Sequence, residues 1–240
     1  MKIEEVIFKL TQADSVSELF TLYENYMAYL GFDHVLLALI TDHVALKQEA
    51  QHGVLFSYPE DWVEYYLDQV YDVIDPVRHH ICASIDHFSW NELIQTQPLS
   101  KKQKRLFNEA EEAALFNGIG IPLRGPRGAI AGIGACSSVK DIELSQQVRH
   151  QAFMISQQFY VCYWRLMELK PSSQQVWLTD KEQDILRWAA HGFSRLEIGA
   201  KLKITENTID YHIKNILRKL DVRNITAAVV IALNLGFIQV

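Results

Sequence analysis

The chain has 240 residues, of which 49% are apolar and 22% charged, a composition that is ordinary for a globular protein and excludes a disordered, fibrous or low-complexity chain. Its formal net charge of −6 is uneven: residues 1–170 hold 14 Lys and Arg against 22 Asp and Glu, and residues 171–240 hold 9 against 7. An acidic body repels DNA whereas a mildly basic segment can present a local positive face, so we expect two domains with different tasks.

Export and membrane insertion are not expected. Glu4 and Glu5 make the N-terminus acidic at once, without the apolar stretch of a signal peptide. Residues 225–240 are uncharged but fall short of the roughly 20 apolar residues that a membrane-spanning helix needs. We therefore expect a cytosolic protein that does not contact a membrane.

The three cysteines, Cys82, Cys136 and Cys162, are odd in number and widely spaced. The sequence contains no Cys-x-x-Cys, which argues against a disulfide framework or a zinc ribbon. We expect all three to be buried apolar residues.

Local signals predict an α+β domain over residues 1–170. Ser15–Glu18 and Ser100–Gln103 each fit a capping box, in which a hydroxyl and a carboxylate or amide satisfy orphan backbone N–H groups at the start of a helix. Apolar runs bounded by Gly and Pro are typical of strands, and helices beside a mainly antiparallel sheet share a single core. In chain order the predicted elements are a helix over 16–30, a strand over 35–40, a helix over 101–116, strands over 119–123 and 129–136 joined as a hairpin through 124–128, and a helix over 144–169.

A change of composition predicts a linker over residues 171–177. Pro171 is followed by small and amide residues, which is typical of an exposed connection between domains. Residues 178–240 then predict a separate all-α domain of four helices.

Helix start signals are strong in this C-terminal segment. Capping boxes begin at Thr179 and Ser194, Thr205 can cap a third helix, and Gly192 suits a left-handed helix end. The first predicted helix runs from Thr179 to near Gly192, with Ile185, Leu186 and Ala189 inward. The second runs from Ser194 to Lys201 or Leu202, the third begins at Thr205, and the fourth covers 225–235. In the third helix, Ile209, Ile213, Ile216 and Leu220 recur at intervals of 4, 3 and 4, which predicts one buried stripe.

Two short helices joined by a tight turn, the second with a polar outer face, predict a helix-turn-helix. Such a unit places its second helix in the major groove of DNA. The pattern alone leaves open a generic helical bundle that binds protein. Further residues at fixed spacing are Leu178-Thr179, Glu182, Leu186, Trp188, Gly192, Ser194, Glu197-Ile198, Leu202, Ile204, Asn207-Thr208-Ile209, His212, Asn215-Ile216, Lys219-Leu220, Val222 and Gly236.

This set resembles the LuxR-type helix-turn-helix over nearly all of residues 178–238. In that family the outward residues of the third helix contact bases, and Lys can donate to guanine and Asn to adenine. Here Asp210 departs from the family pattern, since a carboxylate either accepts from cytosine or repels the DNA backbone. We expect His212 to be a packed structural residue. The resemblance implies base contacts at Asn207, Asp210, Tyr211 and Lys214, and phosphate contacts at Thr205, Asn215 and Arg218.

A second constellation lies in the acidic domain. Tyr58, Trp62 and Tyr66 are spaced by four residues, so a helix over 59–71 would bring them to one face. Three such aromatics are usually core residues. A pocket becomes plausible because indole N–H groups, phenol hydroxyls and a carboxylate all need partners when buried, and a small molecule with amide and carbonyl groups would supply them.

With Asp75-Pro76, Trp90 and Gly118, these aromatics resemble the autoinducer-binding domain of LuxR-type quorum-sensing regulators. The resemblance implies an N-acyl-homoserine lactone as ligand and no metal or other cofactor. The roles it implies are a Trp62 donor to the lactone carbonyl, a Tyr58 donor to the amide carbonyl, an Asp75 acceptor from the amide N–H, Trp90 packed on the lactone ring, and Tyr66 along the acyl chain.

The acyl wall departs from the family pattern at two places. Many members carry Ser or Thr on the last strand of the sheet, where this chain has Gly134 or Ala135, and some carry Thr where it has Val77. Both changes remove polarity, so we expect weak recognition of a substituent at C3. The expected apolar wall residues are Leu36, Ala38, Ile40, Val54, Val77, Phe107 and Ile133.

Other functions are weaker fits to the sequence. Asp75 with His79, His80 and His87 could form a metal or acid–base cluster, but neighbouring histidines on a helix point about 100° apart, and hydrolase and phosphate-binding motifs are missing from the sequence. A response regulator needs acidic residues after its first strand, where this chain has only Asp42. The Gly-x-Gly runs at 118–120 and 132–134 lack a third glycine and are better explained as close-packed strands.

We therefore expect a transcriptional regulator, not an enzyme, with an α+β autoinducer-binding domain over 1–170 and a four-helix DNA-binding domain over 178–240. It is expected to bind an N-acyl-homoserine lactone and a double-stranded DNA operator as a homodimer. The helix over 144–169 and the final helix are the expected dimer contacts. An orphan or ligand-independent regulator of this family, or one that responds to another small molecule, remains the alternative.

Overall fold

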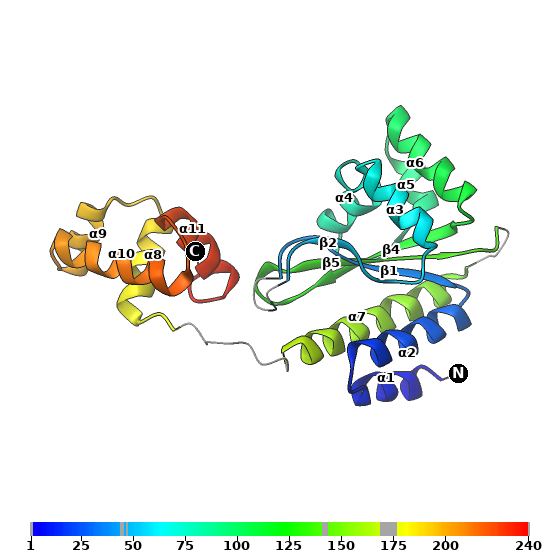
Figure 1. Cartoon of the computed structure of the whole chain (residues 1–240), viewed down its shortest axis with the longest axis horizontal. Helices are drawn as coiled ribbons and strands as arrows, with labels where there is room; N and C mark the ends of the chain where they lie inside the picture. Colours follow the sequence, from blue (N-terminus) through cyan, green and yellow to red (C-terminus); the bar gives the residue numbers. More distant parts are fainter. Residues whose placement is uncertain (1, 44–45, 47, 141–143, 169–176, 240) are drawn as a thin grey trace. The chain divides into compact units, whose positions relative to one another are not determined.

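The computed structural model describes residues 2–43, 46, 48–140, 144–168 and 177–239 (Figure 1). The chain forms two compact units, one with the sheet and helices α1–α7 and the other with helices α8–α11. Most of the predicted linker over 171–177 lies outside the described residues. None of the described helices is both long and apolar enough to cross a membrane.

A five-stranded antiparallel sheet is the middle layer of the N-terminal unit, with the strand order β2-β1-β5-β4-β3. Helices α1, α2 and α7 cover one face, and α3–α6 lie over the other (Figure 1). The strands are β1 (His34–Leu39), β2 (Gln51–Phe56), β3 (Phe88–Ser89), β4 (Phe116–Arg124) and β5 (Ile130–Ser137). The helices are α1 (Ile3–Gln12), α2 (Val16–Tyr29), α3 (Glu60–Asp68), α4 (Pro76–Ala83), α5 (Trp90–Thr96), α6 (Lys101–Glu112) and α7 (Gln146–Glu168), with short 3₁₀ turns η2 (Tyr71–Val73) and η3 (Pro126–Gly128).

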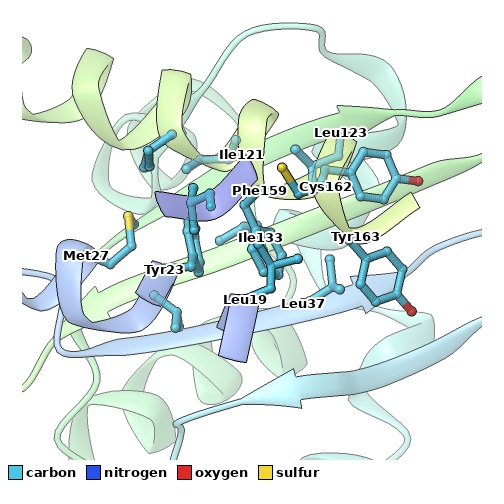
Figure 2. Close-up of a cluster of buried hydrophobic side chains, with 14 of the residues drawn as sticks. Leu19, Tyr23, Met27, Leu37, Ile121, Leu123, Ile133, Phe159, Cys162 and Tyr163 are labelled. Carbon is cyan, nitrogen blue, oxygen red and sulfur yellow. The ribbon is translucent and has the colours of Figure 1, made fainter. Parts of the chain in front are cut away.

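Successive side chains of a strand point to opposite faces, so the sheet separates two clusters of buried residues. Leu37 and Ile133 face the α2–α7 layer and belong to the larger core, shown in Figure 2. There the ring of Tyr23 stacks on Phe159 with centroids 4.3 Å apart, and its hydroxyl shares a 2.7 Å hydrogen bond with Ser156. On the opposite face, Leu36 and Ala38 belong to a smaller cluster beneath α3 and α6.

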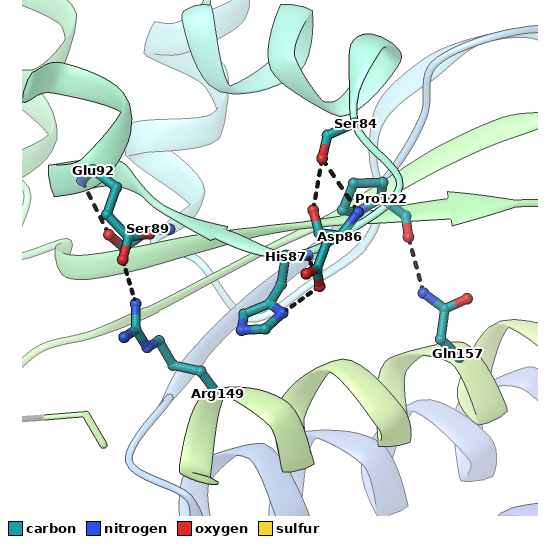
Figure 3. Close-up of polar contacts among 8 residues, drawn as sticks. All are labelled: Ser84, Asp86, His87, Ser89, Glu92, Pro122, Arg149 and Gln157. Carbon is teal, nitrogen blue, oxygen red and sulfur yellow. Dashed lines mark hydrogen bonds and ion pairs between the residues drawn. The ribbon is translucent and has the colours of Figure 1, made fainter. Parts of the chain in front are cut away.

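Polar contacts fasten α5 and β4 to α7 (Figure 3). Gln157 of α7 donates to the carbonyl of Pro122 on β4 at 2.9 Å, and Arg149 Nη1 lies 2.9 Å from a carboxylate oxygen of Glu92. Glu92 also accepts from the backbone N–H of Ser89 at 2.9 Å, and this bond together with Arg149 lowers the pKa of Glu92 to about 2. The Glu92 contacts hold the N-terminal end of α5 against α7.

Three predicted helices and three predicted strands of this unit are confirmed, with one boundary error. The helix predicted over 101–116 ends at Glu112, because Ala114 adopts a left-handed φ of 59° and Phe116 already belongs to β4. The predicted hairpin through residues 124–128 joins β4 to β5. Ser15 caps α2 as predicted, but Glu18 accepts from the N–H of Asp14 rather than that of Ser15.

A helix over 59–71 is too long a prediction. Helix α3 ends at Asp68, and Val70 follows with a left-handed φ of 54° before the chain turns into η2. Helices α1, α4 and α5 and strands β2 and β3 were not predicted; β3 has two residues, and β2 is only partly buried, so neither shows a clear period.

The cysteine prediction is wrong at one position. Cys136 and Cys162 are buried, but Cys82 is exposed. Helix α4 buries Pro76, Val77 and Ile81, and Cys82 follows on the neighbouring, outward face.

The C-terminal unit consists of α8 (Asp180–Ala190), α9 (Arg195–Leu202), α10 (Glu206–Leu220) and α11 (Ile225–Asn234). Thr179 and Ser194 form reciprocal capping boxes with the glutamates three residues later, and Thr205 caps α10, as predicted. Gly192 has a φ of 84° beyond the end of α8. The predicted stripe of α10 is buried against Ile185, Leu186, Ile198, Ala228 and Ala232.

Candidate ligand pocket and nucleic-acid interface

A cavity lies in the N-terminal unit between the sheet and helices α3, α4 and α6. Its lining is mostly apolar with a few polar groups, which is typical of small-molecule sites. All five predicted ligand-binding residues line it, together with thirteen others. The lining residues are Leu36, Ala38, Ile40, His52, Tyr58, Trp62, Tyr66, Asp75, Val77, Arg78, Ile81, Trp90, Leu106, Phe107, Ala110, Leu115, Gly132 and Gly134.

Helix α3 supplies the aromatic wall. Pro59 begins the helix, so Tyr58 stands just before it and Trp62 and Tyr66 follow on consecutive turns of one face. All three side chains are buried. The Tyr58 hydroxyl lies against Gly134 on β5, where an added Cβ would come within 3.0 Å of it, and burial raises the pKa of Tyr58 well above its usual value.

Asp75 is positioned by the start of α4. Its Oδ1 accepts from the backbone N–H of Val77 and its Oδ2 accepts from the Tyr66 hydroxyl, both at 2.8 Å. Burial raises the pKa of Asp75, although these hydrogen bonds favour the ionised form. A carboxylate offers about four lone-pair sites, so Asp75 can still accept a further hydrogen bond.

Trp90 covers one end of the cavity and is the first residue of α5, behind the Ser89–Glu92 capping box. Its indole lies on Gly118, where an added Cβ would come within 2.1 Å of ring atoms, so only glycine at 118 allows the ring to lie here. The Trp90 Nε1 atom is buried and has no hydrogen-bond partner within the described chain. A buried N–H without a partner is costly, and a bound molecule with an acceptor would satisfy it.

The prediction of the apolar wall is correct at Leu36, Ala38, Ile40, Val77 and Phe107, which line the cavity. It is wrong at Val54 and Ile133, which pack in the core beneath the other face of the sheet. On β5 it is Gly132 and Gly134 that face the cavity, and Ala135 faces away with Ile133. The two-residue period of β5 could have revealed this.

The sequence analysis missed several lining residues. Leu106 and Ala110 belong to α6, whose buried face could have indicated them. His52, Arg78 and Ile81 come from β2 and α4, which were not predicted, and Leu115 follows the unpredicted end of α6.

The rival cluster of Asp75 with the histidines is not assembled. Asp86, not Asp75, pairs with His87, whose Nδ1 lies 2.8 Å from the carboxylate. Across the ranges that the structure describes, no three His, Cys, Asp or Glu side chains are placed to hold a metal ion. The glycines at 118, 120, 132 and 134 are close-packed against Trp90, Phe88, Ile81 and Tyr58, as expected for strand residues.

Helix α10 has one buried face and one polar face. Its buried stripe faces the core of the C-terminal unit, while Asn207, Tyr211 and Lys214 are exposed. His212 is half-buried beside the stripe, with its ring 5.7 Å from that of Tyr211. The polar face of α10 is therefore free to contact a macromolecule.

Asp210 has a partner from α9. Arg195 Nη1 lies 2.8 Å from its carboxylate, so the negative charge that departs from the family pattern is neutralised on this face. Of the residues predicted to contact phosphate, Thr205 is exposed and caps α10, and Arg218 is exposed with its guanidinium 3.5 Å from the half-buried Asn215. Sequence reasoning missed Arg195.

Two family models together cover most of the chain. The autoinducer binding domain matches residues 15–161, and the model described as bacterial regulatory proteins, luxR family, matches residues 176–232.

Among curated relatives, the chain is 30% identical to the putative HTH-type transcriptional regulator y4qH of Sinorhizobium fredii over 84% of this chain and 62% of that protein. It is 31% identical to the HTH-type quorum sensing-dependent transcriptional regulator RpaR of Rhodopseudomonas palustris, over 90% of this chain and 87% of the relative. A crystal structure of Escherichia coli SdiA shares the fold, with a TM-score of 0.77, 24% identity and coverage of 99% and 98% of the two chains. These relatives are transcriptional regulators rather than enzymes.

Proposed function

Because the chain belongs to the LuxR family of quorum-sensing transcriptional regulators with an autoinducer-binding domain, we propose that it binds an N-acyl-homoserine lactone and, as a homodimer, a specific DNA operator. Residues 1–170 form the proposed ligand-binding domain and residues 178–240 the proposed DNA-binding domain, joined by a linker over 171–177.

The observation that carries the ligand proposal is the convergence of donors and one acceptor on a single apolar cavity. Tyr58, just before α3, contributes a hydroxyl, Trp62 on α3 contributes an indole N–H, and Asp75 contributes a carboxylate from the start of α4. An acyl-homoserine lactone has an amide and an ester, which need two donors and one acceptor. In the proposed complex Trp62 donates to the lactone carbonyl, Tyr58 donates to the amide carbonyl, and Asp75 accepts from the amide N–H.

The remaining predicted residues shape the site. Trp90 would pack on the lactone ring at the end of the cavity where its orphan N–H lies. Tyr66 would line the acyl chain and, through its 2.8 Å bond to Asp75, orient the carboxylate. Gly134 and Val77 bring no polar side chain to the cavity, so we expect no strong preference for a 3-oxo group.

Helix α10 is the proposed recognition helix. Its exposed side chains could meet base edges, while cationic residues neutralise phosphates. The proposed base contacts are Asn207, Asp210, Tyr211 and Lys214, and the proposed phosphate contacts are Thr205, Asn215 and Arg218.

A homodimer would present two copies of α10 to half-sites about one helical turn apart. Exposed apolar side chains support the two proposed contact helices: Met154 and Val161 on α7, and Val230 and Leu233 on α11. A ligand that fills the cavity stabilises the folded state by mass action and so raises the amount of protein able to dimerise.

The test is the melting temperature and soluble yield of the full chain, expressed with and without homoserine lactones of graded acyl length. We expect a gain of several degrees that depends on chain length, since only a ligand that prefers the folded state raises the melting point. A 3-oxo lactone and the unsubstituted lactone of equal length should give similar gains.

The contrary result is protein that is already soluble, binds DNA and is unaffected by any lactone. It would identify an orphan or ligand-independent regulator, or one with another small-molecule ligand. A strong preference for 3-oxo lactones would refute the weaker claim about C3.

A further inference from the structure

Arg78 is an unexpected residue in the wall of the cavity. Helix α4 lines the cavity with Val77, Arg78 and Ile81, so one charged side chain belongs to a wall that is otherwise aliphatic along this helix. Its Nη1 atom is buried and has no hydrogen-bond partner within the described chain. Its Nη2 atom has one long contact, 3.5 Å from the carbonyl oxygen of Ile40.

The described chain brings no counter-charge to Arg78. None of the ion pairs found within the described ranges involves it. Asp75, the carboxylate that lines the cavity, accepts from the Tyr66 hydroxyl and the Val77 N–H, and its remaining lone pairs are those proposed to accept the ligand's amide N–H. The Arg78 side chain is half-buried and keeps its charge, and leaving its buried Nη1 donor without an acceptor costs free energy.

His52 is a second basic side chain that lines the cavity. It lies on β2, and its ring stacks on Tyr66 with centroids 4.2 Å apart and planes at 12°. Burial, and secondarily the charge of Arg78, lower the pKa of His52 to about 4, so the imidazole is neutral near pH 7. It adds no positive charge beside Arg78 and brings no negative one.

The contact of Arg78 with the end of β1 shows on which side of the cavity its guanidinium lies. Its Nη2 atom lies 3.5 Å from the carbonyl oxygen of Ile40, two residues beyond Ala38, which pairs with Gly132. Tyr58, the proposed donor to the amide carbonyl, lies instead against Gly134. Arg78 is therefore toward the Gly132 end of the acyl wall, away from the proposed amide site.

We propose that Arg78 forms a polar subsite for an oxygen acceptor carried by the acyl group of the ligand, at a carbon beyond C3. The inference rests on the proposed function and narrows its ligand class: the chain takes an acyl group with a hydroxyl, carbonyl or carboxylate oxygen rather than a plain alkyl chain. Such an oxygen would complete the hydrogen bonding of Nη1, and a charge-assisted bond of this kind is among the stronger ones in proteins.

The test measures dissociation constants by calorimetry with the full-length protein. The probes are octanoyl-homoserine lactone, the same lactone with a hydroxyl at successive carbons beyond C3, and the same lactone with a terminal carboxylate. The variants are Arg78→Met, which keeps the length of the side chain without its donors, and Arg223→Met as a matched control at an exposed position of the C-terminal unit.

In the wild type, we expect at least one oxygen-bearing lactone to bind about ten-fold or more tightly than octanoyl-homoserine lactone does. Arg223→Met should show the same preference. Arg78→Met should lose this preference and bind the plain lactone more tightly. A preference for the carboxylate identifies an ion pair and a preference for the hydroxyl identifies a neutral acceptor; both support the subsite. Arg78→Lys, which keeps the charge with fewer donors, should retain part of the preference and serves if Arg78→Met does not fold.

The inference is overturned if plain octanoyl-homoserine lactone binds the wild type as tightly as every oxygen-bearing probe, or if the preference survives in Arg78→Met. In that case the lactones still bind, and the proposed function stands. Failure of every lactone to bind the wild type overturns the proposed function and this inference together.

Discussion

The two units of the chain place their polar groups in opposite ways. In the N-terminal unit, Trp90 Nε1 and Arg78 Nη1 are buried at the cavity and have no partner among the described residues. In the C-terminal unit, the described buried side chains are apolar apart from Glu182, which is engaged with Thr179 and Lys219. Asn207, Tyr211 and Lys214 are exposed on the outer face of α10.

This difference indicates different relations between stability and binding. Unsatisfied groups in an interior lower the stability of the free protein and become satisfied only when a ligand enters. A unit with a filled apolar core and an outward polar face has no buried group that waits for a partner. Its folding stability therefore does not depend on binding. Under the proposed function, the N-terminal unit is the one whose stability responds to a ligand.

The largest expected effect follows from the core of the C-terminal unit. Ile216→Ala removes a fully buried side chain of α10 and should lower the free energy of unfolding of this unit by about 2–5 kcal/mol. Native-state hydrogen exchange of the backbone amides of α10 in the full chain would measure it. Lys214→Ala, two residues earlier on the exposed face, is the control and should change stability by less than about 0.5 kcal/mol while weakening DNA binding.

Comparable losses of stability in the two variants would mean that the faces of α10 are not divided as described. A loss of the lactone-induced stabilisation in Ile216→Ala would contradict the assignment of the ligand response to the other unit.

The C-terminal unit could be predicted almost completely from the sequence, because its signals are local. Thr179, Ser194 and Thr205 satisfy backbone groups within three residues of themselves, and the spacing of the α10 stripe is set by helix geometry. In the N-terminal unit the same signals located α2 and α6. Helices α4 and α5 also carry local start signals, the Asp75 cap and the Ser89–Glu92 capping box, which the sequence could have revealed. Strand β2 is only partly buried and gives no such signal.

An intermediate effect is expected at Asp75. Asp75→Asn should leave the stability of the free protein within about 1 kcal/mol, because asparagine is also a good helix cap and the substitution removes a buried charge. It should abolish most of the stabilisation by homoserine lactones. If the Oδ1 atom of the new asparagine accepts the Val77 N–H as the cap, its Nδ2 donor would face the ligand's amide N–H, and two donors cannot bond to each other. Thermal unfolding with and without ligand measures both quantities. An undiminished lactone response would remove Asp75 from the site.

The same carboxyl predicts a pH dependence. Burial raises the pKa of Asp75 in the free protein, whereas accepting the amide N–H favours the ionised form and lowers that pKa. Lactone affinity should therefore be full above the raised pKa and fall as the pH is lowered through it, in a range above about 3.9, the ordinary value for aspartic acid. Titrations of affinity against pH should show this fall in the wild type and lack it in Asp75→Asn.

The residues that line the cavity show which parts of the site could be predicted from the sequence. Tyr58, Trp62 and Asp75 were found by resemblance, and half of the wall by apolar character. Arg78 was missed because a charged residue is expected on a surface, and only the placement of α4 shows that its guanidinium lines the cavity. Val54 and Ile133 were misplaced because apolar character does not reveal which face of a sheet a residue occupies.

The smallest expected change in stability concerns the pair on the outer face of the C-terminal unit. Arg195 and Asp210 are both substantially exposed, so Arg195→Gln should alter the free energy of unfolding by less than about 1 kcal/mol. Its effect on DNA binding should be larger, because the substitution removes a cation and leaves the Asp210 carboxylate unpaired beside the DNA phosphates. The measurement is affinity for a duplex selected from a random pool by the wild-type protein, at several salt concentrations.

Two further variants separate these causes. If Asp210 repels the backbone once Arg195 is gone, then Arg195→Gln with Asp210→Asn should recover part of the lost affinity. If Arg195 itself contacts a phosphate, the double variant should stay as weak as Arg195→Gln, and its salt dependence should fall by about one unit relative to the wild type. Asp210→Asn alone tests direct base contact, because loss of an acceptor for cytosine would change the selected sequence at one base pair rather than the affinity for all duplexes. An ion pair of little value to folding would then explain how a carboxylate is tolerated on the proposed recognition helix.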